Sequence, residues 1–341
     1  MKQKLKLALV GAGERGQYCY APYAKMHGYE IEFVAVADPH KGRREKFVQD
    51  YHVPAEGVFE TAEQFFARPR MADAVLICTQ DSQHYAYACQ AIDLGYSILL
   101  EKPISPSVRE CLDLQRRAEE KGTQIMVCHV MRYTKFYRKL KELIDSGKFG
   151  APMVIKCTHR ADGVADDYTT AMAVTDTAIH EIDVLPWLVN DEWDEVQCIM
   201  PKTNSKVKNA LKDPQIMIMK TKGGIINMLE VNVNCGFGYD INCEVVCENG
   251  VVNLPCPSFP TVRYANEVST KIEDNWILRF IDSYDVEIQD WVDHARKGET
   301  GGSSAWDGYV ASITADALVK SQTSGVPEKV VTGGTPDFYK K

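Results

Sequence analysis

The sequence predicts an α/β domain with a parallel sheet, followed by an α+β domain with a large, mostly antiparallel open sheet. Three observations support this fold class. Short apolar runs alternate with helix-spaced polar segments up to about residue 130, and runs with period-two alternation follow them. The chain has 341 residues, which suits two domains better than one. We expect the domains to cover residues 1–128 and 129–341.

Short apolar runs mark the expected strands of the first domain. They are residues 5–10, 31–38, 72–79, 97–103 and 123–130. The intervening segments 82–95 and 105–122 have helical spacing and end in Gly95 and Gly122, the usual residue type just after a helix. Nearly continuous apolar strands that alternate with helices indicate βαβ units in a parallel sheet covered on both faces.

The pattern changes in the second half of the chain. Residues 134–150 predict one amphipathic helix that ends near Gly147. The runs with alternating polarity are residues 153–160, 215–221, 224–235 and 239–254. Lys-Gly-Gly and Glu-Asn-Gly turns interrupt them, which favours an antiparallel sheet with one face solvated or in an interface. Residues 276–298 and 306–325 predict two long helices.

Composition excludes several classes of partner. The chain is 45% hydrophobic and 25% charged, with a formal net charge of −8, so neither nucleic acid nor an anionic membrane is expected as the main partner. No apolar stretch approaches the ~18–20 residues of a transmembrane helix. The eleven cysteines are scattered singly, and the apolar run at the N-terminus is too short for a signal peptide. We therefore expect reduced thiols and a cytoplasmic location.

A glycine-rich motif follows the first expected strand. GAGERG, residues 11–16, matches G-x-G-x-x-G between a strand and a helix, which is the context that a Rossmann nucleotide site requires. Gly11 permits the tight turn, Gly13 lets a pyrophosphate approach the backbone, and Gly16 allows close helix–strand packing. Glu14 and Arg15 complete the motif, where amides at the helix start face the phosphates. The alternative is a simple glycine turn.

Asp38 predicts the choice of cofactor. It ends the second expected strand, 22 positions beyond Gly16 (38 − 16), where a carboxylate accepts the ribose hydroxyls of NAD and repels the 2′-phosphate of NADP. The alternative is a turn aspartate before Pro39. Because Arg43 and Arg44 follow closely, NADP is disfavoured but not excluded.

Two further motifs connect the chain to a known family. Glu101-Lys102-Pro103 closes the fourth expected strand, and Asp176 and His180 stand four residues apart in TDTAIHEIDVLPWL. Together with GAGERG, these motifs resemble the glucose–fructose oxidoreductase/inositol dehydrogenase/MocA family. The resemblance covers nearly the whole chain, because SAWDGYVASITADALVKS is similar to the closing helix of that family. Within the family, IHEIDVLPWL and GYDINCEVV are most similar to myo-inositol 2-dehydrogenases.

The resemblance implies NAD-dependent oxidation of a secondary hydroxyl on a cyclic polyol or sugar, by a homodimer or homotetramer assembled through the C-terminal sheet. It makes Lys102, Asp176 and His180 the catalytic residues, with Lys102 also beside the nicotinamide. It places His159 and Tyr239 in the polyol pocket. The positions that it places at the cofactor are Thr79, Gln80, His84 and Glu101. One departure concerns the residue after His159-Arg160, which is typically asparagine in inositol dehydrogenases. Here it is Ala161, which cannot hydrogen-bond a ring hydroxyl, so the substrate is expected to differ from myo-inositol at one ring position.

The chemistry of these residue types fits that reaction. A histidine such as His180 can act as a base near neutral pH, and Lys102 can donate to the substrate oxygen. Asp176 is expected on the same helix face as His180, where it orients the imidazole or binds a neighbouring hydroxyl. It could instead cap the helix N-terminus. Pro186 is expected to kink this helix or to shorten it.

Other functions stay open from the sequence alone. His180-Glu181 begins like the zinc motif H-E-x-x-H, but the fifth position is Val184, so no metal site is expected. A glycoside or sugar 3-dehydrogenase and an NAD-assisted glycosidase are alternatives on the same scaffold. A non-enzymatic NAD-sensing regulator is a third, since Rossmann folds also serve that purpose.

Overall fold

The computed structural model describes residues 3–205, 207, 210–255, 259–299 and 301–340. The chain divides into two compact units. The first unit comprises Met1–His129, Ile281–Ser312 and Gly334–Lys341, and the second comprises Val130–Phe280 and Ile313–Gly333. The boundary expected at 128/129 lies next to the first break between the units, and the first unit also includes two later segments of the chain.

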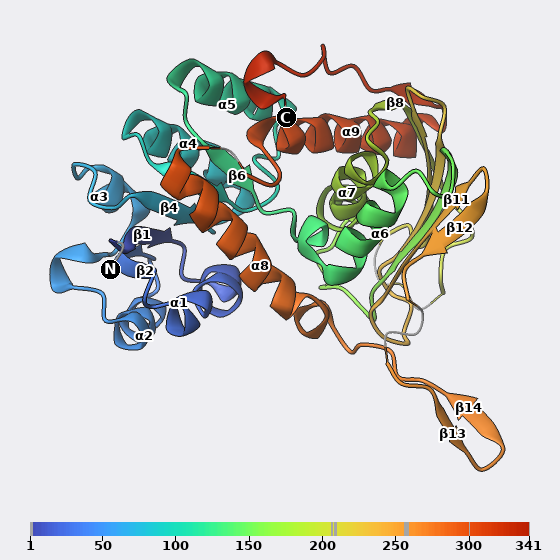
Figure 1. Cartoon of the computed structure of the whole chain (residues 1–341), viewed down its shortest axis with the longest axis horizontal. Helices are drawn as coiled ribbons and strands as arrows, with labels where there is room; N and C mark the ends of the chain where they lie inside the picture. The colour runs from blue at the N-terminus through green and yellow to red at the C-terminus, as the bar shows by residue number, and fades with distance from the viewer. Residues whose placement is uncertain (1–2, 206, 208–209, 256–258, 300, 341) are drawn as a thin grey trace. The chain divides into compact units, whose positions relative to one another are not determined.

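The first unit contains a six-stranded parallel sheet in the order β3-β2-β1-β4-β5-β6 (Figure 1). Its strands are β1 (Leu5–Val10), β2 (Ile31–Ala37), β3 (Val58–Phe59), β4 (Ala74–Ile77), β5 (Ser97–Leu100) and β6 (Ile125–Val127). Every residue of β4 is buried, as expected for a strand with helices on both faces of its sheet. The parallel sheet predicted from the sequence is therefore confirmed, while the two-residue strand β3 was not predicted.

The helices between these strands follow the predicted pattern. They are η1 (Arg15–Tyr20), α1 (Tyr23–Met26), α2 (Lys41–Tyr51), η2 (Ala55–Gly57), α3 (Ala62–Phe66), α4 (Asp81–Asp93) and α5 (Val108–Lys121). Gly95 and Gly122 have φ of 74° and 63°, so both take the left-handed conformation that ends a helix. The strand order reverses between β1 and β4, and ligands of open α/β sheets bind at the carboxyl ends of strands beside such a reversal.

Later parts of the chain complete the first unit. Val127 donates its backbone N–H to Ser303 O at 2.7 Å, which extends the β6 edge of the sheet. The Tyr339 hydroxyl in η5 (Asp337–Tyr339) donates to Gln115 O at 2.6 Å. These contacts join α5 and β6 to residues more than 170 positions further along the chain.

The second unit contains a seven-stranded sheet in the order β12-β11-β7-β10-β9-β8-β15. Its strands are β7 (Pro152–Arg160), β8 (Trp193–Ile199), β9 (Gln215–Thr221), β10 (Ile226–Asn232), β11 (Asp240–Cys247), β12 (Gly250–Asn253) and β15 (Glu328–Lys329). The β7–β10 pair is parallel and the other described pairs are antiparallel. The prediction of a mostly antiparallel sheet is confirmed.

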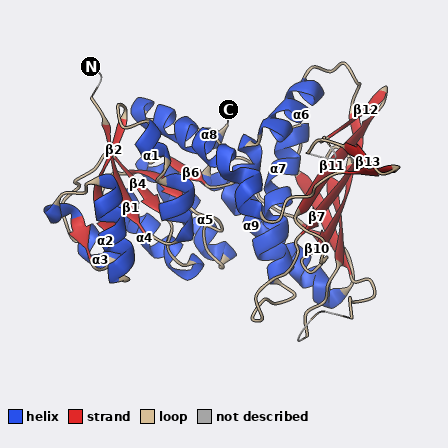
Figure 2. Ribbon diagram, turned by 90° about the horizontal axis from the view of Figure 1, so that it is seen from below, coloured by secondary structure: helices blue, strands red, loops and turns tan. Residues whose placement is uncertain are grey.

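Helices cover one face of this sheet. The helices that belong wholly to this unit are η3 (Val130–Tyr133), α6 (Lys135–Asp145), η4 (Ala173–Ala178) and α7 (Ile179–Val189). Figure 2 shows α6 and α7 on one side of the sheet. Strand β10 follows this arrangement, because Asn227, Leu229 and Val231 are fully buried whereas Ile226 and Met228 are exposed. The face of the sheet that points away from α6 and α7 is therefore exposed to solvent in the described part of the chain.

Two long helices and a small hairpin complete the described elements. Helices α8 (Trp276–Lys297) and α9 (Ala305–Ser324) confirm the two long helices predicted from the sequence. Strands β13 (Val262–Tyr264) and β14 (Glu267–Ser269) form a separate antiparallel hairpin in which every residue is exposed. No helix among the described residues is long and apolar enough to cross a membrane.

Pro186 does not end helix α7, which continues to Val189. A proline has no N–H, so the carbonyl of Ile182, four residues earlier, lacks its usual helical partner. The Trp193 indole Nε1–H donates to this carbonyl at 2.9 Å. A side chain at the start of β8 therefore replaces the hydrogen bond that Pro186 removes.

Candidate active site

The glycine-rich turn fits the roles predicted for its glycines. Gly11 has φ of 94°, and a Cβ on it would overlap the carbonyl of Cys78 at the end of β4. A Cβ on Gly16 would overlap the Gly11 carbonyl, so the helix can lie close to β1 only with glycine there. Gly13 faces open space, where the nearest atom to an added Cβ is the Arg43 guanidinium at 3.9 Å. This is the space that a pyrophosphate needs.

Asp38 joins the glycine-rich turn to the start of α2. Its Oδ2 accepts the backbone N–H of Ala12 at 2.8 Å, and its Oδ1 accepts that of His40 at 2.8 Å. The turn role considered from the sequence is therefore present. Each carboxylate oxygen can accept a further hydrogen bond, so a ribose contact is compatible with this turn. The nearby Arg44 is buried, and its Nη1 donates to Asp38 O at 2.7 Å.

Glu101 lies at the carboxyl end of β5 in a buried polar cluster. Its Oε1 accepts the Tyr20 hydroxyl at 2.9 Å and lies 3.9 Å from Arg15 Nε. Arg15 Nη1 donates to the Tyr284 hydroxyl at 2.6 Å. Burial alone would lower the pKa of Arg15, but electrostatic interactions with Tyr284 and Glu101 outweigh it and raise that pKa. Burial also raises the pKa of Tyr20, which keeps its hydroxyl protonated as the donor to Glu101.

Lys102 follows Glu101 and is 8% exposed. Its backbone N–H donates to Glu101 Oε2 at 3.0 Å, and its peptide bond to Pro103 is cis. The fully buried His84 connects this turn to the end of β4, because its Nδ1 lies 2.7 Å from Pro103 O and its Nε2 lies 3.2 Å from Thr79 O. His84 thus faces backbone carbonyls on two strand ends.

Thr79 and Gln80 lie between β4 and α4. Gln80 caps the N-terminus of α4 in a reciprocal pair with Gln83. The Thr79 hydroxyl oxygen is buried without a hydrogen-bond partner among the described residues. An unpaired buried hydroxyl is costly, and at this strand end it fits contact with a bound polar ligand.

The second unit carries a buried polar chain on the inner face of its sheet. His159 on β7 is 3% exposed, and Glu181 on α7 is 0% exposed. His159 Nδ1 lies 2.9 Å and 3.0 Å from the two carboxylate oxygens of Glu181. His159 Nε2 lies 2.9 Å from the Tyr239 hydroxyl, beside the start of β11. Predicted pocket residues His159 and Tyr239 thus contact one another, and Glu181 joins them.

His180 lies in the first turn of α7 and is partly exposed. Its ring is nearly parallel to that of His159, at an interplanar angle of 27° and a centroid distance of 6.3 Å. Asp176 lies in η4, which is a π-helix over Ala173–Ala178, whereas His180 is in α7. The suggestion that Asp176 caps the helix is wrong, because the capping positions are Met172 for η4 and Ala178 for α7. The ordinary α-helical spacing assumed for the pair is also wrong at Asp176, because a π-turn is wider.

A buried ion pair fixes α7 to η3. Arg132 Nε and Nη2 donate to the two carboxylate oxygens of Asp183 at 2.7 Å and 2.6 Å. The Arg132 guanidinium also lies 6.0 Å from the centre of the Trp187 ring. Both charged side chains are almost fully buried, and the fork geometry permits one orientation of the helix. This pair holds the helix that presents His180 and Glu181.

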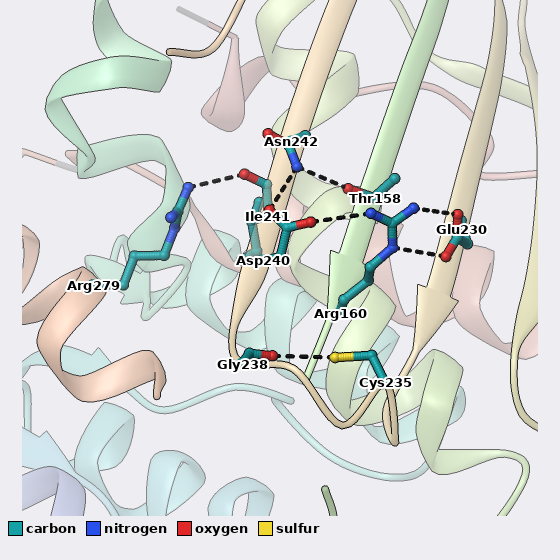
Figure 3. Close-up of polar contacts among 9 residues, drawn as sticks. All are labelled: Thr158, Arg160, Glu230, Cys235, Gly238, Asp240, Ile241, Asn242 and Arg279. Atoms are coloured by element: carbon teal, nitrogen blue, oxygen red, sulfur yellow. Dashed lines mark hydrogen bonds and ion pairs between the residues drawn. The ribbon is translucent and has the colours of Figure 1, made fainter. Parts of the chain in front are cut away.

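Figure 3 shows the opposite face of the same strands. Arg160, next to His159 on β7, makes paired hydrogen bonds of 2.8 Å and 2.7 Å to Glu230 on β10 and one of 3.0 Å to Asp240 on β11. These bonds raise the pKa of Arg160. Cys235 donates to Gly238 O at 3.2 Å within the turn that leads to Tyr239. Strand β7, which carries His159, and strand β11, which follows Tyr239, are thus tied together from the solvated side.

The described cysteines and possible metal ligands bear on whether the chain has a thiol or metal site. All ten described cysteines are free thiols. Burial raises the pKa of Cys78 and of Cys128, which disfavours the reactive thiolate. Within the described ranges, no group of three or more His, Cys, Asp or Glu is placed to hold a metal ion.

Several residues of these clusters were not predicted from the sequence. Tyr20 and Tyr284 join Arg15 and Glu101, but the tyrosines belong to separate helices far apart in the chain. Glu181 was considered only as part of a zinc motif. Its position directly after His180 was the available signal, since a carboxylate on an apolar helix needs a buried partner.

Two family models match the chain. The model described as "Oxidoreductase family, NAD-binding Rossmann fold" matches residues 5–129, and "GFO/IDH/MocA C-terminal domain" matches residues 137–253.

Curated relatives and solved structures match over nearly the full length. Inositol 2-dehydrogenase of Pseudomonas savastanoi pv. phaseolicola is 39% identical over 98% of this chain and 99% of its own. Inositol 2-dehydrogenase of Klebsiella pneumoniae (strain 342) is 39% identical over 99% of each chain. The crystal structure of myo-inositol dehydrogenase from Lactobacillus casei in complex with NAD(H) and myo-inositol has a TM-score of 0.92 at 34% identity, covering 99% of this chain and 100% of that one.

Proposed function

Because the chain belongs to the glucose–fructose oxidoreductase/inositol dehydrogenase/MocA family of NAD-dependent oxidoreductases, we propose that it oxidises a secondary hydroxyl on a cyclic polyol or sugar. The observation that carries the substrate class is the buried polar chain Glu181–His159–Tyr239 beside His180. A site built to hydrogen-bond hydroxyls favours a multiply hydroxylated ring, because a ligand without them leaves buried polar groups unpaired. Ala161 favours a ring that differs from myo-inositol at one position.

The residues of the first unit fit NAD. We propose that the glycine-rich turn with Gly11, Gly13, Glu14, Arg15 and Gly16 surrounds the pyrophosphate. Asp38 would accept the ribose hydroxyls of the adenosine. Thr79, Gln80 and Glu101 would lie near the nicotinamide half, and His84 would contribute by holding the Lys102–Pro103 turn against the end of β4.

Bound NAD supplies the hydride acceptor in this proposal. His180 takes the proton of the reacting hydroxyl, and Lys102 donates a hydrogen bond to its oxygen as negative charge develops. Asp176 orients the imidazole or binds a neighbouring hydroxyl. His159 and Tyr239 hold the ring. The assignment of these roles to one reacting hydroxyl rests on the family relation.

One screen tests the proposed function. Purified protein is incubated with NAD and each of a panel of cyclitols, aldoses, glycosides and aliphatic secondary alcohols, and NADH is followed by its absorbance. We expect turnover on at least one cyclitol or sugar and almost none on 2-butanol. Turnover confined to 2-butanol would contradict the substrate class. A glycoside 3-dehydrogenase would form NADH only with glycosides, while an NAD-assisted glycosidase would cleave them without net NADH.

The first prediction concerns cofactor preference. Replacing Asp38 with serine is expected to lower the ratio of kcat/KM with NAD to that with NADP by roughly 10- to 100-fold, since the variant loses a carboxylate that accepts the ribose and repels a phosphate. The matched control is Glu60→Gln, which removes the charge of a carboxylate that pairs with Arg44 from an exposed position. The control should change the ratio less than about twofold. Equal use of both cofactors by the unaltered protein would contradict the role of Asp38.

The second prediction concerns assembly. We propose that two or four copies associate through the solvated face of the C-terminal sheet. Large apolar side chains are exposed on its strands β8, β10 and β12: Ile199, Ile226, Met228 and Val251. Several exposed apolar side chains on one sheet face are typical of an interface between copies. Met228→Lys is expected to yield monomers in sedimentation equilibrium, whereas Tyr29→Lys, at an exposed position in the first unit, should not. An unaltered protein that is monomeric would contradict the proposal.

A cytoplasmic location also remains a proposal. The free thiols of the described cysteines support it, because a reducing compartment keeps cysteines in this state.

A further inference from the structure

We propose that Glu181 is a positioning residue that fixes which ring nitrogen of His159 carries the proton, and thereby makes the Tyr239 oxygen an acceptor for a substrate hydroxyl. The inference rests on the proposed function in one respect, namely that His159 and Tyr239 contact a hydroxylated ring. The arrangement of Glu181 and His159 themselves is independent of the substrate.

The first step concerns His159 Nδ1. Both carboxylate oxygens of Glu181 lie within 3.0 Å of this nitrogen. An ionised carboxylate only accepts hydrogen bonds, so Nδ1 must carry a hydrogen and donate it to the pair of oxygens. Since Glu181 is 0% exposed, this donor supplies a hydrogen-bond partner that a buried carboxylate needs.

The second step concerns the other ring nitrogen. A neutral imidazole with its hydrogen on Nδ1 has an acceptor at Nε2. Tyr239 Oη lies 2.9 Å from Nε2, so in this neutral tautomer the phenol donates its hydrogen to His159. The lone pairs of Tyr239 Oη then accept a hydrogen bond from another donor. In the series Tyr239–His159–Glu181, each group therefore donates its hydrogen bond toward Glu181. A substrate hydroxyl extends this series by donating to Tyr239.

The third step concerns how α7 holds this carboxylate in place. Glu181 lies in α7, which continues directly from η4, so the carboxylate is carried by an extended helical segment. The Arg132–Asp183 pair fixes the orientation of the same helix. Because His180 precedes Glu181, one helical turn presents the proposed base and the residue that sets the polarity of the neighbouring chain.

If the hydrogen bonds of the series Tyr239–His159–Glu181 ran in the opposite direction, the pocket would select different ligands. With a hydrogen on Nε2, His159 would donate to Tyr239, and the phenol would donate into the pocket. Such a site would bind an acceptor, for example a ring fluorine or an ether oxygen, about as well as a hydroxyl. With the polarity that Glu181 imposes, a fluorine in that position faces the lone pairs of Tyr239 and is rejected.

The first arm of the experiment reads the proton directly. Full-length protein is labelled with ¹⁵N-histidine, and two-bond ¹H–¹⁵N correlation spectra are recorded without substrate, with His159→Asn used to assign the His159 signals. We expect the unaltered protein to show His159 protonated at Nδ1 and not at Nε2. Glu181→Gln is expected to show a mixture, because an amide can either accept from Nδ1 or donate to it.

The matched control is Glu230→Gln. It also removes the charge of a carboxylate, but on the solvated face of the sheet, where Glu230 pairs with Arg160. We expect this control to leave the tautomer of His159 unchanged. A general loosening of the sheet would affect both variants, whereas the positioning role predicts a change only in Glu181→Gln.

The second arm reads recognition with the ring polyol that gives the highest turnover and its monodeoxy-monofluoro analogues. In Glu181→Gln we expect KM to rise about tenfold with a smaller change in kcat, since Tyr239 binds the ring rather than reacting with it. The KM ratio of the most strongly rejected analogue to the parent polyol should fall by about tenfold in the same variant.

The outcomes separate this inference from the proposed function. A proton on Nε2 in the unaltered protein, or an unchanged tautomer in Glu181→Gln, would overturn the role of Glu181. An unchanged fluoro discrimination in that variant would also overturn it. If no ring polyol or sugar turns over, the proposed function fails, and the NMR arm still decides whether Glu181 sets the tautomer.

Discussion

Replacing His180 with alanine is expected to lower kcat and kcat/KM by roughly 10²- to 10⁴-fold, the usual contribution of a positioned base. Lys102→Ala should lower them on the same scale, because the reacting oxygen loses its hydrogen-bond donor. The dissociation constant of NAD should change less than about threefold in His180→Ala. Initial rates measured with the preferred polyol, together with calorimetric titration of NAD, check these expectations.

His52→Asn is the matched control for the histidine variant. His52 ends α2 with φ of 55°, a left-handed conformation that asparagine also adopts, so the fold should tolerate the change. The kcat of the His52→Asn variant should stay within about twofold of that of the unaltered protein. Turnover close to normal in His180→Ala would show that another group is the base.

The largest stability effect is expected at the buried Arg132–Asp183 pair. Arg132→Met leaves the Asp183 carboxylate buried without its guanidinium, so the free energy of unfolding should fall by about 3–5 kcal/mol. The double variant Arg132→Met/Asp183→Leu should recover most of this loss, because an apolar pair carries no desolvation penalty. Urea unfolding followed by tryptophan fluorescence and circular dichroism measures both.

An exposed ion pair supplies the comparison. Lys139 and Glu142 on α6 lie 2.8 Å apart with about two-thirds of each side chain exposed. Lys139→Met should change the free energy of unfolding by less than about 0.5 kcal/mol. An equal loss in Lys139→Met and Arg132→Met would contradict the special position of the buried pair.

Local sequence patterns predicted most of the regular structure. Strands of the first sheet were identified by the apolar runs of β1, β2 and β4, and strands of the second by the alternating runs of β7, β9 and β10. A strand buried on both faces is apolar throughout, whereas a strand buried on one face alternates between apolar and polar residues. Strand β8 was not predicted, since acidic residues and a register shift between Trp193 and Glu195 break its alternation.

Sequence motifs predicted those candidate site residues that belong to a short local pattern. GAGERG, Asp38 and Lys102 are local signals at strand ends. The partnership of Glu181 with His159 joins residues 22 positions apart through the packing of α7 on β7, which no spacing rule describes. The π-helical turn at Asp176 was also beyond prediction, because such a turn depends on tertiary contacts rather than on residue propensity.

The first unit is assembled from three separate stretches of the chain, and this constrains how it is made in a cell. Residues 1–129 leave the ribosome first, but the partner of the β6 edge, Ser303, follows only after the whole of segment 130–280. At about 5–20 residues per second, that segment takes roughly 8–30 s to synthesise. During this interval the nascent sheet has an unpaired edge strand, the kind of surface that templates aggregation. The β6 edge of the nascent N-terminal half therefore gains its partner residues only once residues 281–312 have emerged.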